Sequence, residues 1–212
     1  MRIRSLLLGL ALLIGALPTA ASAATEQVVL AGGCFWGMQA VFESVRGVTN
    51  VVAGFSGGAA STAHYDMVST GATGHAESVD ITFDPSQISF RQLLQVYFLV
   101  AHDPTELDRQ GPDDGTQYRS EIYYTTPSQR AQAQATIASL ERQHVFTAPI
   151  VTTLAPLHGF YPAEAYHQNY LVHNPSEPYI VYNDLPKLRD LRKRFPALVN
   201  LSAAPMRVVD AR

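Results

Sequence analysis

The sequence predicts an α/β (α+β) fold, a two-layer sandwich of split βαβ (ferredoxin-like) type with long functional loops. Segments with the period of strands alternate with segments that have the period of helices, roughly in the order β-α-β-β-α-β-α-β. Two βαβ units with their helices on one face form this two-layer arrangement. The 212 residues, 47% of them hydrophobic, suffice for one buried core. We therefore expect a single domain over residues 24–198.

The individual elements follow from hydrophobic period and from boundary residues. Strands are predicted at 26–33, 48–58, 77–85, 118–125 and 149–157. Helices or helical turns are predicted at 35–47, 90–101, 127–145, 163–174 and, on the surface, 185–195. Ser89 and Gln92 form a capping box before the second helix. Thr126 as N-cap, Pro127 at the first helical position and Gln129 three residues after Thr126 begin the third. The polar stretches 61–76 and 102–117 are expected to be functional loops, and residues 199–212 a loose tail.

The first 23 residues are predicted to be a cleaved secretory signal peptide. Two arginines precede an apolar run from Leu6 to Leu17, and small residues at 21–23 end the segment. An uncleaved membrane anchor is the alternative, but the run is short for crossing a bilayer. We therefore expect an exported protein without stable membrane association, located in a bacterial periplasm or, as the alternative, secreted.

Charge and composition exclude one class of partner. The chain has 15 Lys+Arg against 18 Asp+Glu, a net charge of −3, and removing Arg2 and Arg4 with the signal peptide takes it to −5. There is no basic stripe, so nucleic-acid binding is not expected. The single cysteine, Cys34, can close no internal disulfide. An unpaired thiol in an oxidising compartment risks mispairing and overoxidation, which hints at a chemical role.

Cys34 lies between the first predicted strand and the first predicted helix, directly after Gly32 and Gly33. At a helix N-terminus the unpaired N–H groups and the helix dipole stabilise a thiolate, so this position predicts a nucleophile with a lowered pKa. Phe35 and Trp36 follow on the first turn, where they would form an apolar wall beside the sulfur. The alternative is a buried strand-to-helix junction with both aromatic side chains in the core.

Two polar segments offer further candidates. Glu77 enters a strand from a long loop among small residues, and burial there would keep its carboxyl group protonated. The alternative for Glu77 is an ordinary loop salt bridge. Tyr118 could donate a hydrogen bond into a site, whereas Asp113 or Asp114 could simply cap the turn. None of the seven histidines has a recognised ligand spacing and no second cysteine is present, so no metal site is predicted.

Five motifs in this order, GGCFWG, GHAE, HDPT, RQGPDDGTQYRS and YHQNYL, make the chain similar to the A-type peptide methionine sulfoxide reductases. The resemblance covers about residues 28–175. It implies reduction of the S epimer of methionine sulfoxide, free or in proteins, without a metal or an organic cofactor. It also implies that a sulfenic acid forms on the nucleophilic cysteine.

The resemblance assigns a role to each candidate residue. Cys34 matches the nucleophile, and Glu77 of GHAE matches the acid that protonates the leaving oxygen. Tyr65 and Tyr118 match the phenols that bind that oxygen, and Phe35 with Trp36 matches the wall that receives the methyl group. Asp113 matches the aspartate that holds the substrate amide, and Tyr170 matches a tyrosine that lines the pocket.

One departure from the family concerns regeneration. Many members carry a resolving cysteine near the C-terminus, but here that region reads SEPYIVYNDLPKLRD and contains none. We therefore expect a one-cysteine, monomeric enzyme that repairs oxidised extracytoplasmic proteins. An external thiol, from a small molecule or from a thioredoxin-like or glutaredoxin-like donor, would reduce its sulfenic acid.

Two other classes of function compete with this one. A cysteine hydrolase would pair Cys34 with a histidine base such as His75 or His167. A binding module would recognise oxidised methionine without turnover. The hydrolase would form a thioester, and the binding module would tolerate replacement of Cys34 by serine.

Overall fold

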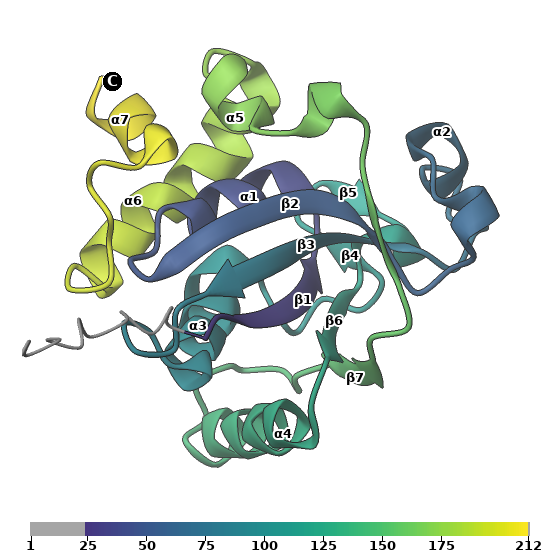
Figure 1. Cartoon of the computed structure of the whole chain (residues 1–212), viewed down its shortest axis with the longest axis horizontal. Coiled ribbons are helices and arrows are strands. Elements are labelled where there is room, and N and C mark those ends of the chain that lie inside the picture. Colours follow the sequence, from purple (N-terminus) through teal and green to yellow (C-terminus); the bar gives the residue numbers. More distant parts are fainter. Residues whose placement is uncertain (1–23, 212) are drawn as a thin grey trace, which may run out of the picture.

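The computed structural model describes residues 24–211 and is built on one mixed sheet (Figure 1). The six strands lie in the order β7-β6-β1-β3-β2-β8. Their bounds are β1 (Glu26–Gly32), β2 (Val48–Ser56), β3 (Ala76–Phe83), β6 (Ser120–Tyr124), β7 (Thr153–Pro156) and β8 (Phe160–Pro162). Neighbouring strands are antiparallel except β6 and β7, which run parallel. A separate hairpin pairs β4 (Arg109–Gln110) with β5 (Asp113–Asp114).

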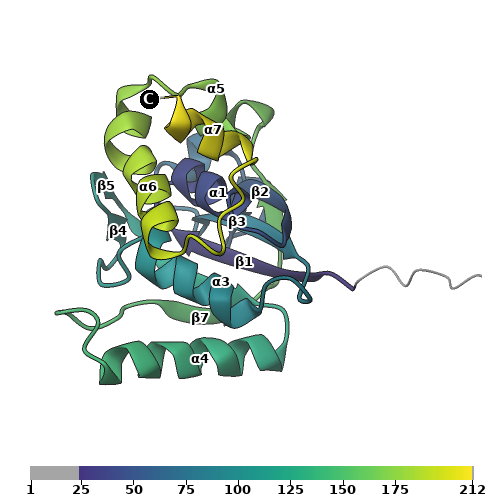
Figure 2. The ribbon, with the colours of Figure 1, turned by 90° about the vertical axis from the view of Figure 1, so that its left-hand side faces the viewer.

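The helices gather in two places around this sheet. They are α1 (Phe35–Glu43), α2 (Tyr65–Val68), α3 (Phe90–Val96), α4 (Pro127–Arg142), α5 (Tyr170–His173), α6 (Leu185–Arg194) and α7 (Ala204–Asp210). Helix α1 lies on the sheet and contacts α5, α6 and α7, whereas α4 packs on α3 and β6 at the opposite end (Figure 2). Two π-helical turns, η2 (Tyr97–Ala101) and η5 (Ile180–Asp184), precede a loop and α6 respectively.

The predicted first strand and first helix form the centre of the core. Val28 to Ala31 are fully buried in β1, which lies between β3 and β6. The apolar positions that predicted the helix, including Met38, Val41 and Phe42, have no exposed surface. Helix α1 connects β1 to β2, and β3 lies between those two strands. This arrangement brings the start of α1 close to the end of β1 and the beginning of β3.

Two predicted helix starts are confirmed by their hydrogen bonds. Ser89 and Gln92 make the complete capping box of α3. At α4 the Thr126 side chain accepts from the amide of Gln129, as predicted, and Pro127 occupies the first turn. The Gln129 side chain, however, accepts from the amide of Thr125 rather than from that of Thr126.

The mixed α/β class is confirmed, and the structure adds elements that the sequence did not predict. Strand β8 has three residues and pairs only with the end of β2. It is too short to show the alternation of apolar and polar residues that predicts a strand. The expected loop 61–76 contains α2, and the expected loop 102–117 contains the β4–β5 hairpin and the beginning of the 3₁₀ turn η3 (Thr116–Tyr118). Both loops therefore have short local structure that holds their polar residues in place.

The prediction of a loose C-terminal tail from residue 199 is wrong for most of its length. Val199 forms an isolated bridge with Val45, and residues 204–210 form α7. Met206 is fully buried against the rest of the molecule. The predicted surface helix, α6, likewise has three fully buried leucines because α1 and α7 pack against it. The tail is ordered by these contacts, which a single sequence does not display.

The predicted signal peptide, residues 1–23, lies outside the described residues. Within residues 24–211, none of the helices has both the length and the apolar character required to cross a membrane.

Candidate functional site

Cys34 is held at the junction between β1 and α1 by the two glycines before it. Gly33 has a φ of +88°, and a Cβ there would lie 2.5 Å from Cγ of Gln110 in β4. A Cβ on Gly32 would lie 2.9 Å from the ring of His102. Only glycine therefore allows these neighbours to approach the chain so closely. Cys34 is the N-cap residue of α1, and 8% of its surface is exposed.

The thiol does not have the lowered pKa that its position predicts. Burial raises the pKa of Cys34 well above its ordinary value, and the carboxyl groups of Glu77 and Asp184 raise it further. A hydrogen bond with the backbone amide of Trp36 acts in the opposite direction but does not outweigh them. The prediction of a lowered pKa is wrong for this structure: the sequence shows the helix N-terminus, but it shows neither the burial of the thiol, which has the larger effect, nor the acids around it.

Glu77 is the second residue of β3, and its surface is 3% exposed. Its Oε2 accepts a hydrogen bond of 3.0 Å from the backbone amide of Phe35, the first residue of α1. Burial raises the pKa of Glu77 to about 8, although this hydrogen bond opposes the shift. This raised pKa supports the predicted protonated carboxyl group, whose partner is a backbone amide instead of the cation of a loop salt bridge.

The aromatic residues after Cys34 differ in what they contact. Phe35 is buried and packs on the rings of Phe55 and His167, with centroid distances of 5.7 Å and 5.0 Å. Trp36 is only half-buried and stacks face to face on Tyr170 at 3.8 Å. Its Nε1 donates to Nδ1 of His167 at 3.1 Å. Trp36 therefore presents a fixed aromatic surface at the start of α1, whereas Phe35 belongs to the core.

Two phenols approach the same carboxyl group from separate segments. Tyr65 begins α2, and Tyr118 ends η3. Burial raises the pKa of both phenols above their ordinary value, and the charge of Glu77 is the next contribution in each case. Both side chains also interact electrostatically with Cys34. The structure thus brings the two predicted phenols together with the thiol and the acid.

Asp113 is placed at the site by a tyrosine that the sequence analysis missed. The Tyr179 hydroxyl donates to Oδ2 of Asp113. The ring of Tyr179 meets the edge of Trp36 at 5.8 Å and 87°, so this residue connects the acid to the aromatic surface. Burial raises the pKa of Asp113, while the hydrogen bond from Tyr179 lowers it. Tyr179 lies beyond the matched motifs, and nothing in its local sequence indicated that it would reach Asp113.

The histidines of the motifs have structural partners. Nδ1 of His75 accepts from the amide of Gly58, and its Nε2 bonds to the carbonyl of Ala59. Both ring nitrogens are therefore occupied. His102 is bonded to the carbonyl of Tyr97 and to Ser120, and burial lowers its pKa to about 4. The hydrogen bonds of these two histidines therefore stabilise the local conformation of the chain.

His167 contacts the aromatic residues of the site. Its Nδ1 is occupied by Trp36, and its Nε2 is buried without a hydrogen-bond partner in the described part of the chain. The hydrolase interpretation requires a histidine base hydrogen-bonded to Cys34, and the hydrogen bonds of His75 and His167 go elsewhere. Over residues 24–211, no group of three or more His, Cys, Asp or Glu residues could hold a metal ion.

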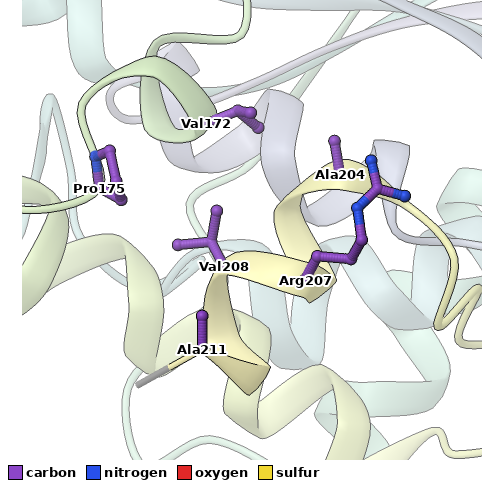
Figure 3. A pocket seen from close by; sticks show the side chains of 6 residues that line it. All are labelled: Val172, Pro175, Ala204, Arg207, Val208 and Ala211. Carbon is purple, nitrogen blue, oxygen red and sulfur yellow. The ribbon is translucent and has the colours of Figure 1, made fainter.

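A pocket of about 560 Å³ lies between α5 and α7, apart from the predicted residues. Figure 3 shows its lining, which is apolar except for one guanidinium group: Val172, Pro175, Ala204, Arg207, Val208 and Ala211. It contains neither a nucleophile nor a carboxyl group.

Comparisons with known proteins place a chain with this fold and site among the oxidoreductases. A family model described as "Peptide methionine sulfoxide reductase" matches residues 26–198. A relative from Mesorhizobium japonicum, named peptide methionine sulfoxide reductase MsrA 2, is 53% identical over 90% of this chain and 97% of its own length. The chain belongs to the peptide methionine sulfoxide reductase family, and it is a peptide-methionine (S)-S-oxide reductase.

Other relatives and solved structures agree. A Synechocystis protein, also named MsrA 2, is 52% identical over 81% of this chain and 80% of its own. Methionine sulfoxide reductase A of Corynebacterium diphtheriae superposes with a TM-score of 0.62 at 36% identity, over 71% of this chain and 76% of that one. Reduced Mxr1 from Saccharomyces cerevisiae gives a TM-score of 0.66 at 30% identity, over 74% and 90%.

Proposed function

We propose that the chain reduces methionine S-sulfoxide, free or in proteins, through attack of Cys34 on the sulfoxide sulfur while Glu77 protonates the leaving oxygen. One observation carries this assignment: the first turn of α1 holds both groups. Cys34 is the N-cap residue, and the amide of Phe35 directly after it binds the carboxyl group of Glu77. Nucleophile and acid are therefore fixed relative to each other by one residue of backbone.

The raised pKa values of both groups suit the overall proton balance. In the net reaction, Cys34 thiol and methionine sulfoxide give Cys34 sulfenic acid and methionine, so no proton is released or taken up. A sulfoxide oxygen leaves readily only when it is protonated. Glu77, with a pKa of about 8, can supply that proton near neutral pH. The thiol proton of Cys34 replaces it, because the sulfenic acid carries one proton on its oxygen.

The surrounding residues supply binding in this proposal. The Tyr65 and Tyr118 hydroxyls, which remain protonated because burial raises their pKa values, donate hydrogen bonds to the sulfoxide oxygen. Trp36 forms the wall for the methyl group, and Tyr170 stacks behind it to fix its orientation. Phe35 supports the wall from the core, and Asp113 receives the amide side of the substrate.

The proposal extends to the biological setting. The single cysteine leaves no internal route from sulfenic acid to disulfide, so an external thiol, small or from a thioredoxin-like or glutaredoxin-like protein, completes each cycle. No metal or organic cofactor takes part. Export by the predicted signal peptide places the enzyme, as a monomer, in a bacterial periplasm or outside the cell, where it repairs oxidised proteins.

The proposal is tested by supplying each sulfoxide epimer separately with a small dithiol as reductant. We expect methionine from the S epimer of both free and peptide-bound methionine sulfoxide, and about background release from the R epimer. Cys34→Ser is the control and should release none. Equal turnover of the two epimers, or turnover by the serine variant, would contradict the assignment of Cys34 and its chiral pocket.

Trp36→Ala tests the wall for the methyl group. Removing the ring opens space beside the sulfur, so we expect selectivity for methyl over bulkier alkyl sulfoxides to fall by roughly tenfold, the scale of one methylene group in an apolar pocket. The measurement is the ratio of kcat/KM for methyl and ethyl sulfoxides. Tyr182→Ala, at a tyrosine that is 78% exposed, is the control. If only thermal stability falls while the ratio holds, Trp36 serves the core alone.

A further inference from the structure

A buried carboxyl group that the proposed reaction does not use lies close to the start of α1. Asp184 ends the turn η5 and has no exposed surface. Its Oδ1 forms an ion pair with Nζ of Lys187 at 3.3 Å. Its Oδ2 is buried and has no hydrogen-bond partner within the described residues. A buried carboxylate oxygen without a partner is costly, so its presence calls for a role beyond packing.

Gly37 shows where this carboxyl group lies relative to Cys34. A Cβ on Gly37 would lie 2.1 Å from Oδ1 of Asp184 and 3.0 Å from Nζ of Lys187. Gly37 is the third residue of α1 and Cys34 is the N-cap of that helix, so the Asp184 carboxyl group packs on the turn that begins at the nucleophile. The missing side chain of Gly37 therefore lets the Asp184–Lys187 pair sit one helical turn from the nucleophile.

Titratable and charged side chains from several segments face Cys34. Glu77 approaches from β3, Asp113 from β5, and the phenols of Tyr65 and Tyr118 from α2 and η3. Tyr179 and Asp184 lie on the segment that leads into α6, and Lys187 is the cation paired with Asp184. Burial raises the pKa of Asp184 above its ordinary value, and Asp113 and Glu177 add to this shift, whereas the ion pair with Lys187 opposes it and so favours the charged carboxylate. Cys34 is thus surrounded mainly by acids, of which Asp184 is the one paired with a cation.

We propose that Asp184, tethered by Lys187, is a positioning residue whose charge, acting across Gly37, controls how readily Cys34 loses its proton. This role rests on the proposed function of Cys34 as nucleophile. The carboxylate keeps the thiol protonated, and so less open to peroxide, until substrate binds. Lys187 limits the effect by holding Oδ1 and by balancing part of the charge.

Asp184→Asn tests this role because it removes the charge and keeps the shape. We expect the midpoint of Cys34 alkylation by iodoacetamide, measured against pH, to fall by about one unit, as expected for removal of one nearby like charge. Alkylation below the midpoint should then be about tenfold faster. Asp190→Asn is the matched control, because it removes the same charge from an exposed ion pair with Arg194 on α6. Its midpoint should equal that of the unmodified chain.

Asp184→Ala is a second variant for the case that Asp184→Asn does not fold, because the alanine leaves no unpaired amide group in the buried position. A downward shift in either folded variant supports the proposal. An unchanged midpoint, with only a lower temperature of unfolding, would overturn it and leave the ion pair a purely structural contact. The alkylation assay uses no sulfoxide, so its result is independent of the epimer assay. An enzyme that reduces neither epimer would overturn the proposed function without altering this measurement.

Discussion

Without an added thiol, the enzyme should release about one methionine per chain from methionine S-sulfoxide and then stop. In the proposed mechanism Cys34 is a sulfenic acid after one reduction, and the sequence contains no second cysteine that could attack it. The experiment is a single turnover under argon, quenched with dimedone. Intact-protein mass should show one adduct, located on Cys34 by peptide analysis.

Addition of a small dithiol should restore continuous turnover, and Cys34→Ser should give neither methionine nor adduct. Peroxide added before the dithiol should inactivate the enzyme by overoxidation of the waiting sulfenic acid. Several methionines per chain without a reductant would contradict this prediction. So would a disulfide-linked dimer as the obligatory product, because either result would show a route of regeneration within the protein itself.

Glu77→Gln should slow reduction by roughly 10²-fold or more, the usual scale of general acid catalysis. The glutamine can still accept a hydrogen bond from the Phe35 amide, but it cannot release a proton. Because the pKa of Glu77 is raised to about 8, the acid form dominates below that pH and is lost above it. The limb that Glu77 contributes to the pH profile of the single-turnover rate should therefore fall as the pH rises through about 8, against a thiolate fraction of Cys34 that increases with pH.

The same limb should be absent from the pH profile of Glu77→Gln. Glu121→Gln is the control for loss of a nearby carboxylate, since Glu121 pairs with Arg119 and belongs to no part of the proposed mechanism. A near-normal rate in Glu77→Gln would show that another group, such as Tyr118 or water, delivers the proton.

The sequence predicted the parts of the fold in which neighbours along the chain decide the structure. Val28 and Leu30 in the first strand, and Met38 and Val41 in the first helix, have clear periods and are fully buried as expected. Helix α7 was missed because its buried face consists of little more than Met206 and Val209, which is too short a pattern to stand out.

The candidate site was predicted where motifs carried it and missed where distant segments meet. The protonation of Glu77 followed from its apolar surroundings in the sequence. The pKa of Cys34 did not, because it depends first on burial of the thiol and then on acids that come from other segments. Tyr179 and Asp184 were missed for the same reason: their partners, Asp113 and Gly37, are remote in sequence. Patterns within one segment of the sequence do not predict contacts between residues that are far apart in the chain.

The packing of Asp184 and Lys187 against Gly37 also affects when, during folding, Cys34 reaches its final environment. Gly37 belongs to the first helix, whereas the pair belongs to the last part of the chain, so this contact joins the two ends of the domain. Contacts between distant segments form late, since a long loop must close first. A chain that is still emerging from a ribosome therefore carries Cys34 without its final surroundings. The thiol acquires its finished chemical character only when synthesis is complete.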